Sequence, residues 1–487
     1  MRSIRLCCSL VLSTAAVLAA VVMIAMCVPL VAAAPSSHRL RAHPPTFTPR
    51  TAGAAAATAG HIQGQDRSGW SKVVNPHGGA AAAPSKWSIP LPGGTLTTGA
   101  FTLDLTVGTG AAQATFAVVV DTGSSNTAVP SVGCASCGQT SGFYNASASP
   151  TAQRVACDAD DCRRCTPGGA PVPLPNMSSS CAYGPARCTS DGQCGFAVSY
   201  GGSNTFISGS VGRDVACVGG PASSASAACA PIFLDAITSQ FPQGNLPNGI
   251  IGLAYPDNAC NPTCQPTFLD SLVANGTLAP DEDKFGMCLS KQSGGVLDLG
   301  FFNSSRARGG EAAFQWTPIV KEHWYNIRVL AMAVGDHDTG VPAEAFGIWN
   351  DAIGSFVDSG TGILIMSPAA FGALSATFQL HYPNCAGLTA LFSGQSAVLT
   401  DDEVGNFPSI HFTVGDMSGS GNFTVSVRGS SYLMAAGNPT HEMAPYTLGI
   451  AGVPSIGLIL GDVVMQDYYI AFDRAGKRLG FAPILEC

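Results

Sequence analysis

The chain has 487 residues, of which 46% are hydrophobic and 11% are charged. This length exceeds what a single hydrophobic core ordinarily holds and predicts two or three domains. The formal net charge is −8 and no basic stripe runs along the sequence, which excludes nucleic acid as a partner because nothing neutralises its phosphates. The 57 glycines and 33 prolines imply frequent turns, and they predict an all-β architecture of short strands.

Residues 1–34 contain Arg2 and Arg5, followed by an apolar run from Leu6 to about Ala34. Small residues near the end of this run suit a signal peptidase, so the segment is predicted to be a secretory signal peptide. The run is long for a signal peptide, which leaves an uncleaved membrane anchor as the alternative. No later stretch is long and apolar enough to span a bilayer, so no membrane association is expected once the signal is removed.

Residues 35–87 are rich in Ala, Gly, Pro and Ser and are predicted to be poorly ordered. Residues 1–86 contain eight basic residues and one acidic residue, whereas the rest of the chain contains 15 basic and 30 acidic residues. A basic leader before an acidic body indicates a zymogen propeptide, whose ion pairs weaken when carboxylates protonate at low pH. The alternative interpretation is a flexible linker.

The first catalytic candidate follows two predicted strands. Phe101–Thr109 alternates like a strand before a turn, and Ala117–Asp121 is a run of β-branched residues that ends in an acid. In the following turn, Gly123 lets the backbone approach closely and Ser124 can hydrogen-bond the carboxylate. A single Asp-Thr-Gly of this kind is more often a turn-forming carboxylate than a catalytic one.

Eighteen cysteines after a signal sequence indicate disulfides in an oxidising compartment. Three lie in the leader, and the odd remainder of fifteen leaves at least one thiol unpaired or in an intermolecular bridge. A cluster of ten between residues 134 and 229 predicts a disulfide-stapled insertion whose main part is at about residues 134–194: Cys134, Cys137, Cys157, Cys162, Cys165, Cys181, Cys188, Cys194, Cys217 and Cys229. Zinc is the alternative, because Cys134/Cys137 and Cys162/Cys165 have ligand spacing.

The remaining cysteines are expected to form local staples. Cys260 and Cys264 are expected to close a loop, and Cys288, Cys385 and Cys487 to staple the second half of the chain in an order that spacing does not determine. Five N-x-S/T tripeptides are candidate glycosylation sites of an exported protein: Asn145, Asn176, Asn275, Asn303 and Asn422.

The second half of the chain repeats the pattern of the first. Ser355–Thr361 again runs apolar, apolar, Asp, hydroxyl, Gly, hydroxyl, and it places Asp358 237 residues after Asp121. Each copy is followed at a comparable interval by an apolar, apolar, Gly unit, in Pro247–Tyr255 and in Gly457–Asp462. This internal duplication predicts two lobes that each contribute one acid.

These four segments resemble the pepsin-like aspartic proteases, and Leu458–Pro483 is the longest and most specific match. The resemblance covers about residues 88–487, least well in the insertion. It implies a bilobal all-β fold, with lobes at 88–300 and 301–487 and the active site in the cleft between them. Within the family the chain looks closer to the beta-secretase and plant or protist branches, because Ala128 stands where most members have Trp.

The family pattern implies specific roles for residues of this chain. Asp121 and Asp358 form the catalytic dyad, supported by the neighbouring residues Thr122, Gly123, Ser124, Ser359, Gly360 and Thr361. The predicted strands 196–203 and 207–214 resemble the family's flap, which makes Tyr200, Gly201 and Gly362 the candidate substrate-binding residues. The resemblance implies no metal and no other cofactor.

Two departures from the family pattern affect these roles. The usual Trp at the position of Ala128 orients the flap tyrosine, so Tyr200 needs another partner here. Gly362 replaces a Ser or Thr and removes a hydroxyl that would hold the substrate backbone.

Two close carboxylates cannot both ionise easily, so such a pair shares one proton, and aspartic proteases are the established example of this splitting. The sequence therefore indicates an aspartic endopeptidase that activates water, is favoured at acidic pH and binds a polypeptide extended in its cleft. A monomer is expected, in the secretory pathway and then outside the cell or in a vacuolar or lysosome-like compartment. The alternative is an inactive binding or inhibitor protein on the same scaffold.

Overall fold

The computed structural model describes residues 86–94, 99–137, 140, 142–163, 189–200, 205–224, 226–239, 248–259, 264–291, 294–347, 353–436 and 443–487. The predicted signal peptide, the propeptide up to residue 85 and the tripeptide at Asn176 lie outside these residues, as do Gly201, Cys165, Cys181, Cys188 and Cys260 with its expected bond to Cys264. Within them, no helix combines the length and the apolar character needed to cross a membrane.

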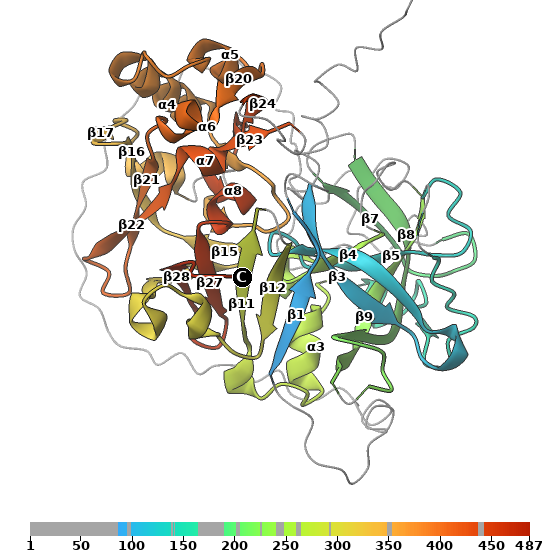
Figure 1. Ribbon diagram of the computed structural model, residues 1–487. Coiled ribbons are helices and arrows are strands. Elements are labelled where there is room, and N and C mark those ends of the chain that lie inside the picture. Colours follow the sequence, from blue (N-terminus) through green and yellow to red (C-terminus); the bar gives the residue numbers. More distant parts are fainter. Residues whose placement is uncertain are drawn as a thin grey trace, which may run out of the picture.

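Most of the described chain is β-strand, which confirms the expected bilobal all-β fold. In Figure 1 the blue-to-green first half and the orange-to-red second half lie side by side, each built around its own sheets. The first half contains a nine-stranded sheet of β2 (Gly93–Gly94), β3 (Ala100–Val107), β4 (Ala114–Asp121), β10 (Ile250–Gly252), β5 (Thr127–Pro130), β9 (Ala228–Ser239), β8 (Thr205–Val218) and β6 (Gln153–Arg154), with β7 (Gly195–Tyr200) paired to β8.

Three sheets belong to the second half. The one that carries the second Asp segment contains β14 (Lys321–Glu322), β15 (Tyr325–Ile327), β18 (Ser355–Val357), β26 (Leu458–Leu460), β19 (Leu364–Met366) and β25 (Ile450–Gly452). The others are β17 (His337–Asp338), β16 (Val329–Val334), β21 (Ile410–Gly415) and β22 (Asn422–Val427), and then β20 (Ala397–Thr400), β24 (Met443–Leu448) and β23 (Leu433–Ala435).

A further six-stranded sheet takes strands from both ends of the chain. It runs through β1 (Trp87–Leu91), β12 (Gly294–Leu299), β11 (Lys284–Ser290), β27 (Tyr468–Asp473), β28 (Arg478–Pro483) and β13 (Gln315–Pro318). The first described strand, β1, therefore lies in the same sheet as the last two, β27 and β28. Because this sheet is shared, the stability of one half depends on that of the other.

The helices are short and lie around the sheets. They are α2 (Asp160–Arg163), α3 (Phe268–Ala274), α4 (Pro368–His381), α5 (Leu388–Phe392), α6 (Asp401–Gly405), α7 (Gly429–Tyr432) and α8 (Asp462–Met465). Residue types set their starts: the side chain of Thr267 accepts the backbone N–H of Asp270 in a capping box at α3, and Ser367 caps α4 ahead of a proline at its first position.

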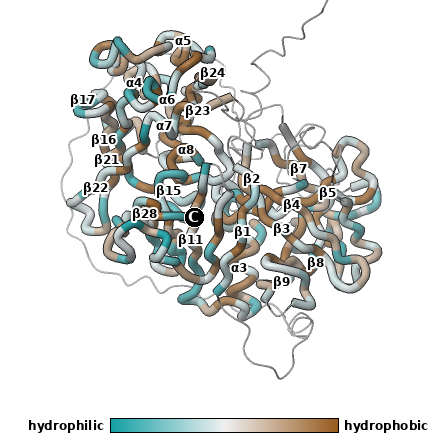
Figure 2. The backbone as a smooth tube through the Cα atoms, viewed as in Figure 1, coloured by the Kyte–Doolittle hydropathy of each residue, from teal (hydrophilic) through white to brown (hydrophobic). Residues whose placement is uncertain are grey.

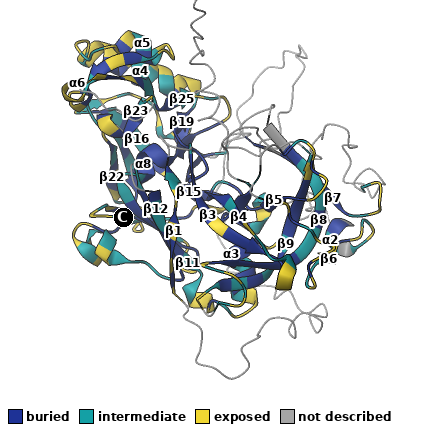
Figure 3. Ribbon diagram, turned by 45° about the vertical axis from the view of Figure 1, so that its right-hand side comes forward, coloured by how far each residue is buried: buried dark blue, intermediate teal, exposed yellow. Residues whose placement is uncertain are grey.

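The strand that leads to Asp121 is apolar throughout because both of its faces are covered. Val118 and Val120 pack into the main core cluster, whereas Val119 packs into a second cluster that includes Ala128 and Tyr200. Figure 2 shows the hydrophobic (brown) character of β3 and β4, and Figure 3 shows that buried residues (dark blue) concentrate in the strands while α4, α5 and α6 carry exposed positions. Burial on two faces explains the continuous run of valines in place of alternation.

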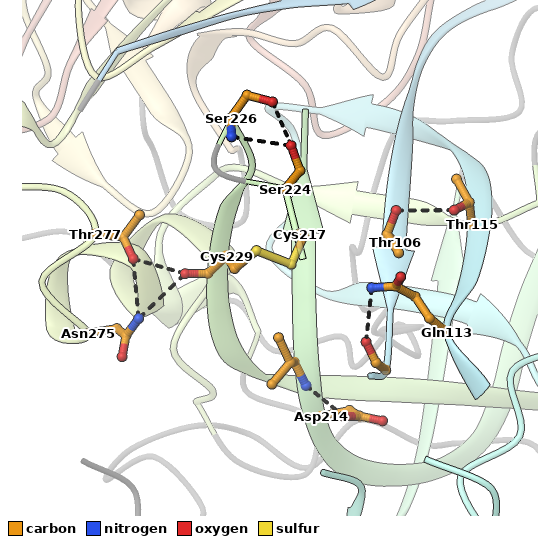
Figure 4. The surroundings of a disulfide bond; sticks show 12 residues. Thr106, Gln113, Thr115, Asp214, Cys217, Ser224, Ser226, Cys229, Asn275 and Thr277 are labelled. Carbon is orange, nitrogen blue, oxygen red and sulfur yellow. Dashed lines mark hydrogen bonds between the residues drawn. A yellow bond between two sulfur atoms is a disulfide. The ribbon is translucent and has the colours of Figure 1, made fainter. Parts of the chain in front are cut away.

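The described cysteines other than Cys385 form disulfides, as predicted, and the zinc interpretation does not hold for Cys134, Cys137 or Cys162. Cys134 bonds Cys137, and Cys162 bonds Cys194 within the insertion. Cys217 and Cys229 were expected in that insertion as well, but they join β8 to β9 inside the nine-stranded sheet. Figure 4 shows this bridge, with the Thr277 hydroxyl donating to the carbonyl of Cys229 at 2.9 Å.

The expected role of Cys385 was wrong. Cys288 on β11 bonds Cys487 at the end of the chain, 199 residues away. This pairing uses two of the three cysteines expected to staple the second half. Cys385 follows α4, packs partly buried against the main core, and is the free thiol among the described cysteines.

Candidate active site

The fold brings the two predicted acids together. Asp121 ends β4 and Asp358 directly follows β18, and their side chains, 2% and 1% exposed, are hydrogen-bonded to each other. A Cβ atom at position 123 would lie 2.4 Å from Oδ1 of Asp358. Glycine is therefore required at 123, because any side chain there would occupy the place of the second carboxyl group.

The two turns hold their acids with the same set of donors. The backbone N–H of Gly123 donates to Asp121 Oδ1, and that of Gly360 donates to Asp358 Oδ1, both at 2.8 Å. The hydroxyls of Ser124 and Thr361 donate to the other oxygen of their acids at 2.5 Å. Each carboxyl group thus has two local donors that stabilise its ionised form.

Thr122 and Ser359 connect the two turns through an exchange of hydrogen bonds. The N–H of Thr122 donates to Ser359 Oγ at 3.1 Å, and the N–H of Ser359 donates to Thr122 Oγ1 at 3.0 Å. Their hydroxyls donate onward to the carbonyls of Val357 and Val120 on the opposite strands. The exchange fixes the two acids relative to each other, because each turn is anchored on the strand that carries the other.

The two downstream glycines lie directly beneath these turns. Gly252 pairs in parallel with Asp121, and a Cβ atom on it would lie 2.5 Å from the backbone of Ser125. A Cβ atom on Gly461 would lie 2.2 Å from the carbonyl oxygens of Thr361 and Ile363. The apolar, apolar, Gly units therefore pass under the two Asp turns at a distance that only glycine allows.

Burial is the largest cause of the pKa shifts of Asp121 and Asp358. It raises the pKa of Asp121 above its ordinary value, against hydrogen bonds from Ser124 and others that lower it. Burial, followed by repulsion from Asp121, raises the pKa of Asp358 well above its ordinary value. Two carboxyl groups that interact in this way titrate as a unit.

The predicted flap strands form a hairpin, because β7 pairs antiparallel with β8 from Gly195 to Tyr200. Tyr200 is buried in the second apolar cluster together with Ala128. Ala128, where the resemblance implies that most members have an indole, is itself fully buried in this cluster. Gly362 is buried immediately after Thr361.

Three residues near the dyad were missed by sequence reasoning. Trp324 and Asn258 contact the Asp121 turn from segments distant in sequence, and nothing in their local sequence marks them. Asp235 lies in β9 inside an otherwise apolar run, a signal that could have been noticed. It is 4% exposed, it pairs laterally with Ala128, and its Oδ2 accepts a hydrogen bond from Asn126 Nδ2 at 2.7 Å.

Asp235 is expected to make the protein less stable as the pH rises. Burial raises its pKa to about 7, above the ordinary 3.8 that applies to the unfolded chain. Stability is therefore full below about pH 4, where both states bind the proton, and falls as the pH rises through 7. We expect Asp235→Asn to increase the free energy of unfolding at about pH 8 by roughly 2 kcal/mol and to change it little at about pH 4.

Urea unfolding at the two pH values measures this difference. Asp104→Asn, an exposed position on β3 of the same sheet, is the matched control and should give no pH-dependent gain. An equal effect of Asp235→Asn at both pH values would contradict the assignment.

A family model described as eukaryotic aspartyl protease matches residues 101–159 and 176–484 of the chain. Cathepsin E of Aquarana catesbeiana is 27% identical over 377 residues, which cover 76% of this chain and 76% of that protein. Penicillopepsin-1 of Penicillium janthinellum is 26% identical over 316 residues, which cover 64% and 85%. An aspartyl protease family protein of Arabidopsis thaliana is 26% identical over 213 residues, which cover 41% and 40%. The residues matched by the family model include both Asp turns and leave out part of the cysteine-rich insertion.

Proposed function

The chain belongs to the eukaryotic aspartyl protease family, and on this basis we propose that it is an aspartic endopeptidase in which Asp121 and Asp358 activate a water molecule. The observation that carries the proposal is the buried, hydrogen-bonded pair of carboxyl groups with matching donors in both turns. A scaffold kept only for binding has no need of both acids and all four donors.

The reaction needs one ionised and one protonated member of the pair. The ionised carboxylate takes a proton from a water held between the two acids, and the protonated carboxyl hydrogen-bonds the carbonyl oxygen of the scissile peptide bond. Attack by the water oxygen on the carbonyl carbon gives a neutral gem-diol, in which the carbonyl oxygen has received the second proton. Transfer of a proton to the amide nitrogen then breaks the C–N bond and releases the two peptide products.

The same family membership supports a proposal for the substrate and for the compartment in which the protein acts. We propose that a polypeptide binds extended in the cleft between lobes at 88–300 and 301–487, beneath a flap that contains Tyr200 and Gly201 and beside Gly362. The disulfides among the described residues, including Cys288–Cys487, support an oxidising compartment of the secretory pathway or outside the cell. We further propose that residues 35–87 act as a propeptide and that the mature protein is a monomer.

Cleavage of a denatured protein mixture by the purified, acid-treated protein tests this function. We expect cleavage to be strongest at the acid end of a series from about pH 3 to about pH 7, because the shared proton is lost as the pH rises. A statine-type peptide, which imitates the gem-diol, should abolish it. Absence of cleavage at every pH by a folded, propeptide-free sample would favour an inactive binding protein.

A further inference from the structure

The carbonyl oxygen of Gly123 accepts two hydrogen bonds from side chains outside its own turn. Trp324 Nε1 donates to it at 2.8 Å, and Asn258 Nδ2 donates to it at 3.1 Å. A backbone carbonyl has two lone pairs, so both acceptor positions of this oxygen are occupied. The two donors come from the segment that leads into β15 and from the 3-10 turn at Pro256–Asn258.

Trp324 is also held by the strand that carries the other acid. Its indole is 5% exposed and stacks on the ring of Phe356, with 5.1 Å between centroids and 18° between planes. Phe356 lies on β18, two residues before Asp358. The indole therefore touches the Asp358 strand with its face and the Asp121 turn with its N–H.

The peptide unit between Gly123 and Ser124 transmits this contact to the acid. In a trans peptide the C=O and the following N–H point in opposite directions and turn together as one plane. The C=O belongs to Gly123, and the N–H belongs to Ser124, whose hydroxyl donates to Asp121 Oδ2 at 2.5 Å and lowers the pKa of that acid. A fixed Gly123 carbonyl consequently fixes the backbone from which the Ser124 hydroxyl reaches the Asp121 carboxylate.

The geometry points to Trp324 and Asn258 as positioning residues for the dyad, which hold the 123–124 peptide so that the hydroxyl of Ser124 stabilises ionised Asp121. This inference rests on the proposed function and adds two residues to its machinery. Because both acceptor positions of Gly123 are filled, a peptide substrate can use this carbonyl only by displacing one donor.

Trp324→Phe tests the inference because it preserves an aromatic ring for Phe356 and removes only the N–H donor. We expect kcat to fall about 10- to 100-fold, with KM changed less than about threefold, since a small displacement of a catalytic group costs rate more than binding. The acid limb of the kcat/KM profile should move to higher pH, because the Ser124 donor to ionised Asp121 is held less well. Asn258→Leu should shift the limb in the same direction by a smaller amount.

Two control variants test whether a change in kcat or in the acid limb comes from the loss of any indole or from the neighbouring His323. Trp316→Phe makes the same substitution on β13, where the indole packs against Phe314 away from the dyad, and it should leave kcat and the profile unchanged. His323 packs edge-on against Trp324 at 4.3 Å, and burial lowers its pKa to about 4. His323→Gln should leave the acid limb in place, because Asp358 is the titratable group that contacts Asp121.

Unchanged kcat and an unchanged acid limb in Trp324→Phe would overturn the positioning role while leaving the protease function intact. If the wild-type protein cleaves nothing, the proposed function fails. The positioning role of Trp324 is then tested by thermal unfolding of Trp324→Phe and of the wild-type protein. A further rise in the pKa of Asp121 must then make Trp324→Phe lose more stability, relative to wild type, at about pH 7 than at about pH 4. An equal loss at both pH values would overturn it.

Discussion

Asp358→Asn is expected to lower kcat/KM for a peptide substrate by at least about 10⁴-fold, because catalytic groups that act as a unit fail together when one is removed. The amide keeps the shape of the carboxyl group and can still bond Thr361 and Gly360, but it neither holds nor transfers the shared proton. Asp121→Asn should give a loss of similar size. The two losses should not add in the double variant, since either single change already ends proton transfer between the acids.

The measurement is the rate of cleavage of a fluorogenic peptide near the optimum pH, with thermal unfolding recorded for each variant to establish that it is folded. Asp158→Asn, at an exposed position of the first half, should retain wild-type activity. Residual activity within about tenfold of wild type in folded Asp358→Asn would remove this residue from the mechanism.

Arg474→Met is expected to reduce the free energy of unfolding by about 3–5 kcal/mol, the usual cost of leaving buried charges without their partner. The guanidinium is 3% exposed in the turn between β27 and β28, and it forms ion pairs with Asp270 at 2.5 Å and Asp283 at 3.6 Å. It also stands over the ring of Tyr255 at 4.8 Å. Removal of the cation leaves two carboxylates facing each other between α3, β11 and the C-terminal hairpin.

Urea unfolding at about pH 6 measures the loss. Arg428→Met is the matched control, because Arg428 pairs with Asp467 through a side chain that is 67% exposed and such pairs contribute at most about 1 kcal/mol. A loss below about 1 kcal/mol for Arg474→Met would show that water replaces the ion pair and that the cluster is not a stability element.

Several site features were predictable because they depend on local sequence. A buried strand that ends in Asp, a hydroxyl and Gly specifies a turn that presents a carboxylate, and its repetition after 237 residues predicted a paired site. The units at Gly252 and Gly461 could be recognised for the same reason, since only glycine fits beneath the turns. The strand β3 was predicted from its alternating sequence, and the hairpin of β7 and β8 from two strands around a Gly-rich segment and from the family resemblance.

The sequence by itself determined the fold class, the two acids and the donors next to them, because strand periodicity and turn chemistry act over a few residues. Only the tertiary structure decided that Trp324 and Asn258 hold Gly123, that Cys288 pairs with Cys487 and leaves Cys385 free, and that β9 buries Asp235 beside Ala128. These contacts join residues far apart along the chain. Their distances are set by the pairing and packing of whole sheets, on which a short sequence pattern has no influence.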